Sequence, residues 1–123
     1  MIYVRYESAT PNAGGRHPGI FALANKLSRS GRLSEADWDW WRSNNDWLDA
    51  AYTDPATVDP SLFDGSGQAS CWFKSTAGHL LARVPGYLDL LDRHQVGWVE
   101  RRSSDPGQIR YEDDVQVVVA PDR

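Results

Sequence analysis

Residues Ser34 to Tyr52, SEADWDWWRSNNDWLDAAY, organise the rest of the chain, because they hold four of its six tryptophans. The stretch predicts one helix. Ser34 is a favourable N-cap, and Asp37, three residues later, is the acidic partner of a capping box. At about 100° per residue, one side of this helix is apolar, and it comprises Ala36, Trp40, Trp41, Trp47, Leu48, Ala51 and Tyr52. Such a side must pack against other elements of the fold.

Length and composition limit the class of protein. The 123 residues, 41% hydrophobic and 24% charged, are typical of a globular chain, and we expect one domain spanning residues 1–123. The net charge of −4 argues against nucleic acid as a partner. Cys71 is the only cysteine, which excludes an intramolecular disulfide and fits a reducing compartment. Because no window is apolar enough to span a membrane, we expect a soluble, cytoplasmic protein with no membrane partner.

The segment before the tryptophan-rich helix predicts a strand followed by a helix. Residues 2–7 alternate between apolar and polar side chains, which is the period of a strand. Residues 10–15 are rich in turn-forming types, and Pro18 suits the first turn of a helix that begins near His17. Gly31 supplies the left-handed conformation that ends this helix.

The middle of the chain predicts a surface loop and then a long helix. Residues 53–67 contain two Asp-Pro steps, and proline biases the residue before it away from helix. From Ala69 to Val84 the apolar residues recur at helical spacing, so we expect a helix there and reject the alternative of a strand over Ser70–Lys74. Pro85 ends or kinks this helix, whose apolar side continues toward a stop at Gly97.

The last third of the chain changes from helical spacing to a period of two. Residues 98–102, 109–112 and 115–120 predict three strands of a meander, the last of them central in the sheet. With the first strand they predict an α+β domain of order β-α-α-α-β-β-β. In this domain, a four-stranded antiparallel or mixed sheet carries the helices, the third of them kinked, on one face.

Gly14-Gly15-Arg16-His17 is the first candidate for a binding site. Backbone N–H groups before a helix attract anions, glycines allow a ligand close to the backbone, and Arg16 can pair with a phosphate or a carboxylate. The loop matches neither common phosphate-binding pattern, and an ordinary turn explains both glycines. The structural explanation is therefore the favoured one.

Two residues of the tryptophan-rich helix are further binding candidates. Asn44 lies near the middle of the apolar side, where it either anchors a buried hydrogen-bond network or meets a ligand in an aromatic pocket; we favour the network. Trp38 lies on the polar side. If exposed, it marks an interaction surface, and the alternative is that the 53–67 loop covers it.

Acid–base chemistry has only weak candidates, namely His17, His79 and Glu112. His79 fits a residue at the boundary of its helix's apolar side, and Glu112 belongs to a run of three acids that fits a solvated turn. The three histidines share no metal-ligand spacing and no hydrolase motif is present. We therefore expect no metal and no cofactor.

Two classes of function remain open. The first is a small ligand- or protein-binding module that uses the tryptophan-rich helix and adjoining loops. The alternative is a small enzyme that acts on a phosphorylated or nucleotide-like substrate through the Gly14-Gly15-Arg16-His17 loop. The expected partner is an unidentified small molecule or protein, and a homodimer through the tryptophan-rich helix is a further alternative.

Overall fold

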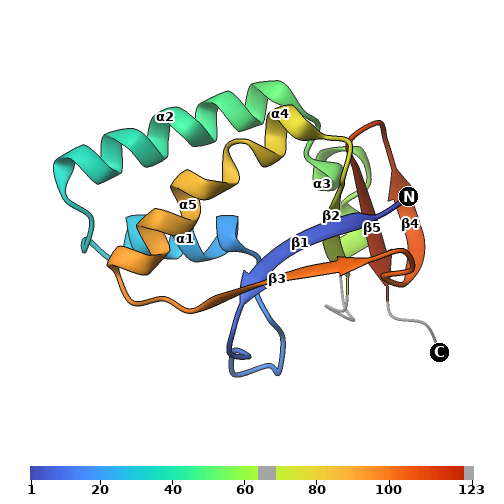
Figure 1. Ribbon diagram of the computed structural model, residues 1–123, viewed down its shortest axis with the longest axis horizontal. Coiled ribbons are helices and arrows are strands. Elements are labelled where there is room, and N and C mark those ends of the chain that lie inside the picture. The colour runs from blue at the N-terminus through green and yellow to red at the C-terminus, as the bar shows by residue number, and fades with distance from the viewer. Residues whose placement is uncertain (64–68, 121–123) are drawn as a thin grey trace.

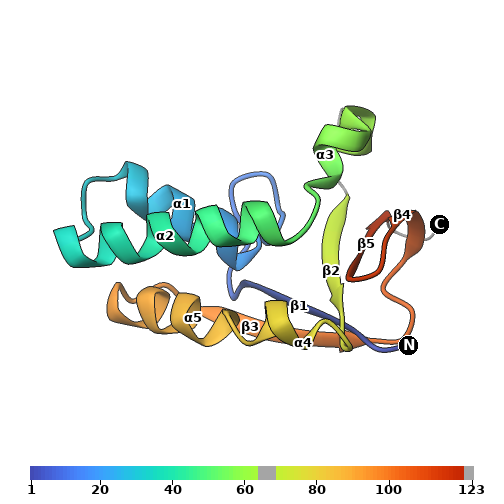
Figure 2. The same cartoon turned by 90° about the horizontal axis from the view of Figure 1, so that it is seen from above.

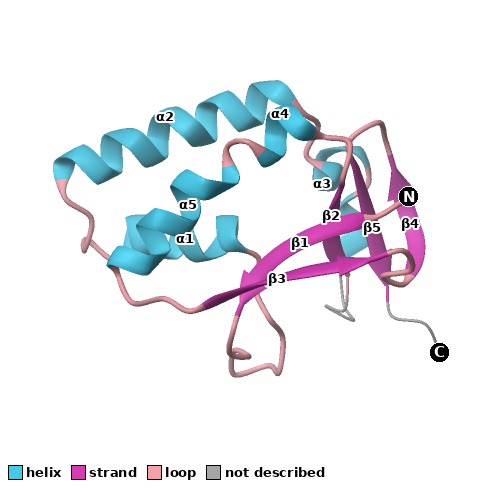
Figure 3. Cartoon of the chain, viewed as in Figure 1, coloured by secondary structure: helices cyan, strands magenta, loops and turns pink. Residues whose placement is uncertain are grey.

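The computed structural model describes residues 1–63 and 69–120, which form an α+β fold with one five-stranded antiparallel sheet. The strand order is β3-β1-β2-β5-β4, and helices α1, α2, α4 and α5 lie beside β1 and β3 (Figures 1 and 3). Figure 2 shows α2 and α5 with roughly parallel axes and opposite chain directions, and α3 set apart beside β2. The elements are β1 (Tyr3–Ser8), α1 (Ile20–Arg29), α2 (Glu35–Ala51), α3 (Pro55–Val58), the 3-10 helix η1 (Pro60–Phe63), β2 (Ser70–Lys74), α4 (Gly78–Leu81), α5 (Val84–Arg93), β3 (Trp98–Ser103), β4 (Gln108–Glu112) and β5 (Gln116–Ala120).

The tryptophan-rich helix α2 forms with the predicted N-cap, but within residues 1–63 and 69–120 the Asp37 carboxylate does not return the hydrogen bond that would complete a capping box. Ser34 is its N-cap, and the Ser34 side chain accepts the backbone N–H of Asp37 at 3.1 Å. The Asp37 carboxylate accepts a hydrogen bond from Arg93 Nη2 at 2.8 Å, so it joins α2 to α5. Trp41 and Leu48 are buried in the core shared by α1, α2, α4 and α5.

The first strand is confirmed, but α1 begins later than predicted. Its N-cap is Gly19 and its first residue is Ile20, so the expected start near His17 is wrong. The reason is that the chain first runs beside β1: the N–H of Ser8 donates to the Pro18 carbonyl at 2.7 Å. Gly31 has φ +75°, which confirms its left-handed position after α1.

Strand β2 corrects the prediction of a helix from Ala69 to Val84. It pairs with β5 at four positions and gives the sheet a fifth strand beyond the four predicted. Phe73 packs in the core beneath the helices, while Trp72 packs in a second cluster with Tyr3, Val117 and Val119. Because both faces of β2 are buried, its apolar residues are consecutive rather than alternating, which the helical period also accommodates.

The predicted kinked helix is two separate helices, α4 and α5. Pro85 lies in the first turn of α5, where its missing N–H is not needed, so it starts a helix instead of kinking one. The left-handed residue after α5 is Gln95, with φ 59°, and not the expected Gly97.

The last three strands exist but do not form a meander. β4 pairs with β5, whereas β3 pairs with β1 and lies at the opposite edge of the sheet. β5 lies between β2 and β4, so it is an interior strand, although β2 and not β5 has the central position predicted for it. The described part of the 53–67 loop folds into α3 and η1, and residues 64–67 lie outside the described ranges.

Candidate functional site

Strands β1 and β2 separate after a short stretch of pairing. They pair only at Tyr3 with Lys74 and at Val4 with Phe73. Beyond this point, the Arg5 side chain lies between them and donates from Nη1 to the Cys71 carbonyl at 2.9 Å. A guanidinium therefore takes the place of a backbone donor from the neighbouring strand.

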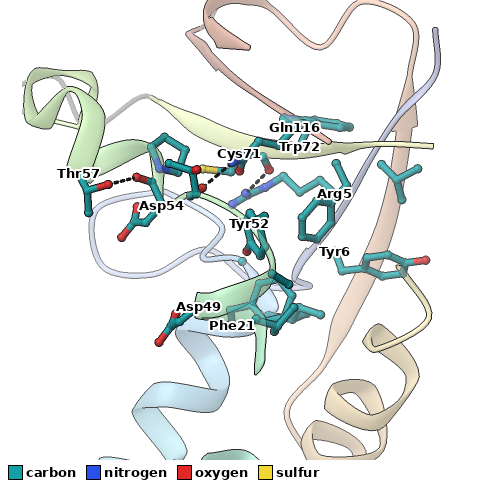
Figure 4. Close-up of a pocket in the computed structure, with 18 of the residues that line it drawn as sticks. Arg5, Tyr6, Phe21, Asp49, Tyr52, Asp54, Thr57, Cys71, Trp72 and Gln116 are labelled. Carbon is teal, nitrogen blue, oxygen red and sulfur yellow. Dashed lines mark hydrogen bonds between the residues drawn. The ribbon is translucent and has the colours of Figure 1, made fainter. Parts of the chain in front are cut away.

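A pocket of about 870 Å³ opens where the two strands separate (Figure 4). Its volume is within the range of small-molecule sites, about 300 to 1,000 Å³. Its wall includes residues of α3, β1 and β2, together with the first turn of α1 and the last turn of α2. The side chains with aromatic rings or polar groups are Arg5, Tyr6, Phe21, Asp49, Tyr52, Thr53, Asp54, Thr57, Cys71, Trp72, Phe73 and Gln116.

The charge of Arg5 is already balanced within the fold. Its Nε donates to Glu7 Oε1 at 2.8 Å, and its Nη2 donates to the His17 carbonyl at 3.0 Å. The second oxygen of the buried Glu7 carboxylate accepts from Arg101 Nε at 2.8 Å. Arg5 is thus a structural cation that ties β1, β2 and the 9–18 loop together.

Two exposed carboxylates lie at the mouth of the pocket. Asp54 Oδ1 accepts the N–H of Ala56 at 3.0 Å, as the N-cap of α3. Asp49 makes no hydrogen bond or ion pair with residues 1–63 or 69–120. Figure 4 shows both carboxylates on the same side of Tyr52, away from Arg5. Their negative charge is therefore less compensated than that of the Glu7 carboxylate.

Burial raises the pKa values of two titratable groups that line the pocket, Tyr52 and Cys71. Burial, together with the smaller effects of the neighbouring Cys71, Asp54, Asp49 and Asp113 in the same direction, raises the pKa of Tyr52 to about 12. Burial also raises the pKa of the Cys71 thiol, against a lowering effect of Arg5. Both groups stay protonated near neutral pH, so neither is an activated nucleophile.

The raised pKa of Tyr52 predicts a loss of stability in alkali. Above pH 10.0 a tyrosine of the unfolded chain ionises, while Tyr52 in the fold stays protonated until about pH 12. The free energy of unfolding then falls by up to about 1.4 kcal/mol per pH unit from this group. Between these pH values, the free energy of unfolding of Tyr52→Phe, measured by urea denaturation, should fall less steeply with pH than that of the wild type. Equal slopes of the two proteins against pH would contradict the raised pKa of Tyr52.

The Gly14-Gly15-Arg16-His17 loop is closed by Asn12. Asn12 Oδ1 accepts the N–H of Gly14 at 2.9 Å and that of Arg16 at 3.0 Å, and the Asn12 carbonyl accepts the N–H of Gly15. These donors are therefore engaged within the loop. The loop also does not lead into a helix, since α1 begins at Ile20.

Arg16 and His17 line a second, smaller hollow of about 240 Å³. His17 Nδ1 lies 2.9 Å from the Ser8 carbonyl and 3.9 Å from Glu7 Oε2. Because a carbonyl only accepts, Nδ1 carries a proton, and in the neutral ring Nε2 is the acceptor. Arg5 lines both this hollow and the larger pocket.

Asn44 lies in an internal network. Its Nδ2 donates to the Trp40 carbonyl at 2.9 Å and its Oδ1 accepts from Arg83 Nη1 at 3.1 Å. The Arg83 guanidinium in turn lies 3.8 Å from the ring centre of Trp47. This arrangement supports the structural explanation of Asn44.

The other predicted residues lie apart from the pocket. Trp38 is 44% exposed on α2 and its ring centre lies 5.9 Å from that of Trp41. His79 is exposed on α4, and Glu112 forms an ion pair with Lys74 at 2.7 Å. Within residues 1–63 and 69–120, no three His, Cys, Asp or Glu side chains are grouped to hold a metal. No helix in the same ranges has the length and apolarity to cross a bilayer.

Sequence reasoning did not single out the residues of the larger pocket, because the pocket depends on β2 being a strand. In the sequence, the Asp54-Pro55 step of this pocket predicts only a loop. Since a fold alone does not specify an activity, function must be argued from the site. No family model, curated protein or solved structure matches this chain.

Proposed function

We propose that the protein is a small-molecule-binding module whose ligand occupies the pocket at the end of α2. The observation that carries this proposal is the 870 Å³ pocket at the separation of β1 and β2. It combines buried aromatic walls with polar groups at the mouth, which is the usual composition of a ligand site. The tryptophan-rich helix and the segment after it supply its lining from Leu48 to Pro55.

The packing of the tryptophans favours a pocket over a protein-docking surface on α2. Trp40 lies edge-on to Tyr87 with ring centres 5.0 Å apart, and Trp41 Nε1 donates to Asn25. Trp47 is covered by Arg83. Of the four tryptophans of α2, Trp38 alone is exposed, and a single exposed side chain does not make an interface.

The test is thermal unfolding against a panel of nucleotides, phosphorylated metabolites, acids, amines and uncharged aromatic compounds. A ligand at 100 times its dissociation constant stabilises by about 2.7 kcal/mol, which is a shift of several degrees in a domain of this size. Because Cys71 lines the pocket and is the only cysteine, a bound ligand should also slow its alkylation by iodoacetamide. No shift and no protection across the panel would refute the proposal.

Filling the mouth of the pocket should remove binding without unfolding the protein. Thr57 is exposed on α3 and lines the pocket, so Thr57→Trp places a large side chain over its opening. We expect at least a tenfold loss of affinity by calorimetry. The matched control is Ser61→Trp, which adds the same side chain at an exposed position of η1 outside the lining. Equal affinity of the two variants would show that the ligand binds elsewhere.

The second candidate is an enzyme that acts on a phosphorylated or nucleotide-like compound at the smaller hollow. It is supported by the common location of Arg16 and His17, with the Glu7 carboxylate 3.9 Å from the imidazole. A phosphate-bearing ligand whose binding is lost in Arg16→Ala and retained in Thr57→Trp would favour this candidate. The reverse pattern would favour the pocket at the end of α2.

A further inference from the structure

Resting on the proposed function, we propose that the pocket at the end of α2 selects an organic cation. The ligand class is an ammonium or amidinium group carried on an aromatic body. The inference combines three features of the lining: its uncompensated carboxylates, its engaged arginine and its aromatic rings.

The carboxylates give the mouth of the pocket a negative charge. Asp49 and Asp54 line the pocket and are exposed, and neither is in an ion pair within the described ranges. Their influence reaches inside, since both raise the pKa of Tyr52, as does Asp113. A cation at the mouth meets two acceptors of opposite charge.

An anionic ligand finds no uncompensated cation among the described residues of the lining, because Arg5 is already paired with Glu7. Among residues 1–63 and 69–120, Arg5 is the one cationic side chain of the lining, and each of its three nitrogens already donates, to Glu7, Cys71 and His17. An anion that recruited Arg5 would compete with the buried Glu7 carboxylate and would lie in the field of the two aspartates. The arrangement therefore disfavours phosphates and carboxylates in this pocket.

The aromatic rings suit the body of such a ligand. Tyr52 lies edge-on to Phe73 with ring centres 5.6 Å apart, and Phe21 lies edge-on to Phe73 at 6.1 Å. Phe21 and Tyr52 are only partly buried and line the pocket. Exposed ring faces and edges attract flat apolar groups, and ring faces also attract cations.

The experiment compares three indoles that differ in charge: tryptamine, the neutral tryptophol and the anionic indole-3-acetate. A second series, benzamidine, benzamide and benzoate, carries an amidinium instead. We expect the cationic member of at least one series to bind at least tenfold more tightly than its neutral partner by calorimetry, and the anion most weakly. In Asp49→Asn/Asp54→Asn the cation's advantage should fall to about twofold or less, since asparagine keeps the shape and the helix cap.

The matched control is Asp39→Asn, which removes the same charge from an exposed position of α2 outside the lining. It should leave the ratio of cation to neutral affinity unchanged. Anions that bind as tightly as cations, or an equal loss of the ratio in Asp39→Asn and in the double variant, would overturn the inference and leave the pocket's binding function standing. If neither cation binds with a dissociation constant below about 1 mM, the inference fails. Ligands from the wider panel would then decide the binding function separately.

Discussion

Arg5→Ala is expected to lower the free energy of unfolding by about 3 to 5 kcal/mol, the largest effect of any single substitution at the site. Glu7 is only 6% exposed, and its carboxylate would lose one of its two arginine partners. The carbonyls of Cys71 and His17 would lose their guanidinium donor at the separation of β1 and β2. A buried charge and two carbonyls without partners each destabilise the fold. Removing Arg5 also removes the free-energy cost of burying its own charge, but this gain is smaller than the loss.

The measurement is urea denaturation. The slope of the free energy of unfolding against urea concentration is compared between the variants, because a changed slope would indicate a changed unfolded state. Arg5→Lys is the matched control: it keeps the charge but not the planar set of donors, so we expect an intermediate loss. A double-mutant cycle with Glu7→Gln should show strong coupling, because the two side chains share one hydrogen bond. A loss below about 1 kcal/mol in Arg5→Ala would refute the structural role.

Arg5→Ala also tests whether the role of Arg5 in stability is independent of ligand binding. Arg5 lines both hollows, but a cationic ligand gains no attraction from a guanidinium that is already paired with Glu7, so the proposed ligand does not need it. If Arg5→Ala remains folded at low temperature, tryptamine should still bind more tightly than tryptophol. A phosphate-bearing ligand that bound through Arg5 would behave in the opposite way.

The sequence predicted those parts of the fold that local interactions determine. The N-cap at Ser34 and the left-handed Gly31 were found because each depends on residues within one turn of the helix. The sequence does not predict strand β2, because its apolar residues fit the spacing of a helix as well as that of a strand, and its partner β5 lies more than 40 residues away in the chain. Only pairing with β1 and β5 decides between helix and strand.

The site depends on the same non-local pairing. The glycines of the Gly14-Gly15 loop predict free backbone N–H groups, but the N–H groups of Gly14 and Arg16 donate to the Asn12 side chain. The sequence pattern does not predict the direction of that side chain. Asp49 and Asp54 are ordinary acids in the sequence. They become a site only because β1 and β2 separate beneath the end of α2.

Gly86→Ala is expected to destabilise the protein by about 1 to 3 kcal/mol through overpacking, although alanine normally favours a helix interior by about 1 kcal/mol over glycine. A Cβ at Gly86 would lie far inside contact distance of Trp40 Cζ2. The Trp40 ring has little freedom to move, because it also packs edge-on against the fully buried Tyr87. α2 and α5 must therefore move apart to admit the methyl group.

Gly78→Ala is the matched control, since a Cβ there meets nothing within 4 Å and the residue is also helical. It should be neutral or slightly stabilising, by up to about 1 kcal/mol. Trp40→Leu removes the ring that causes the clash, so Gly86→Ala should cost much less in that background. Thermal unfolding of the wild type, the three single variants and the Trp40→Leu/Gly86→Ala double variant measures these differences. If Gly86→Ala is as stable as the wild type, the close approach of α2 and α5 at Trp40 is wrong. If its cost is unchanged in Trp40→Leu, the loss has a cause other than the Trp40 ring.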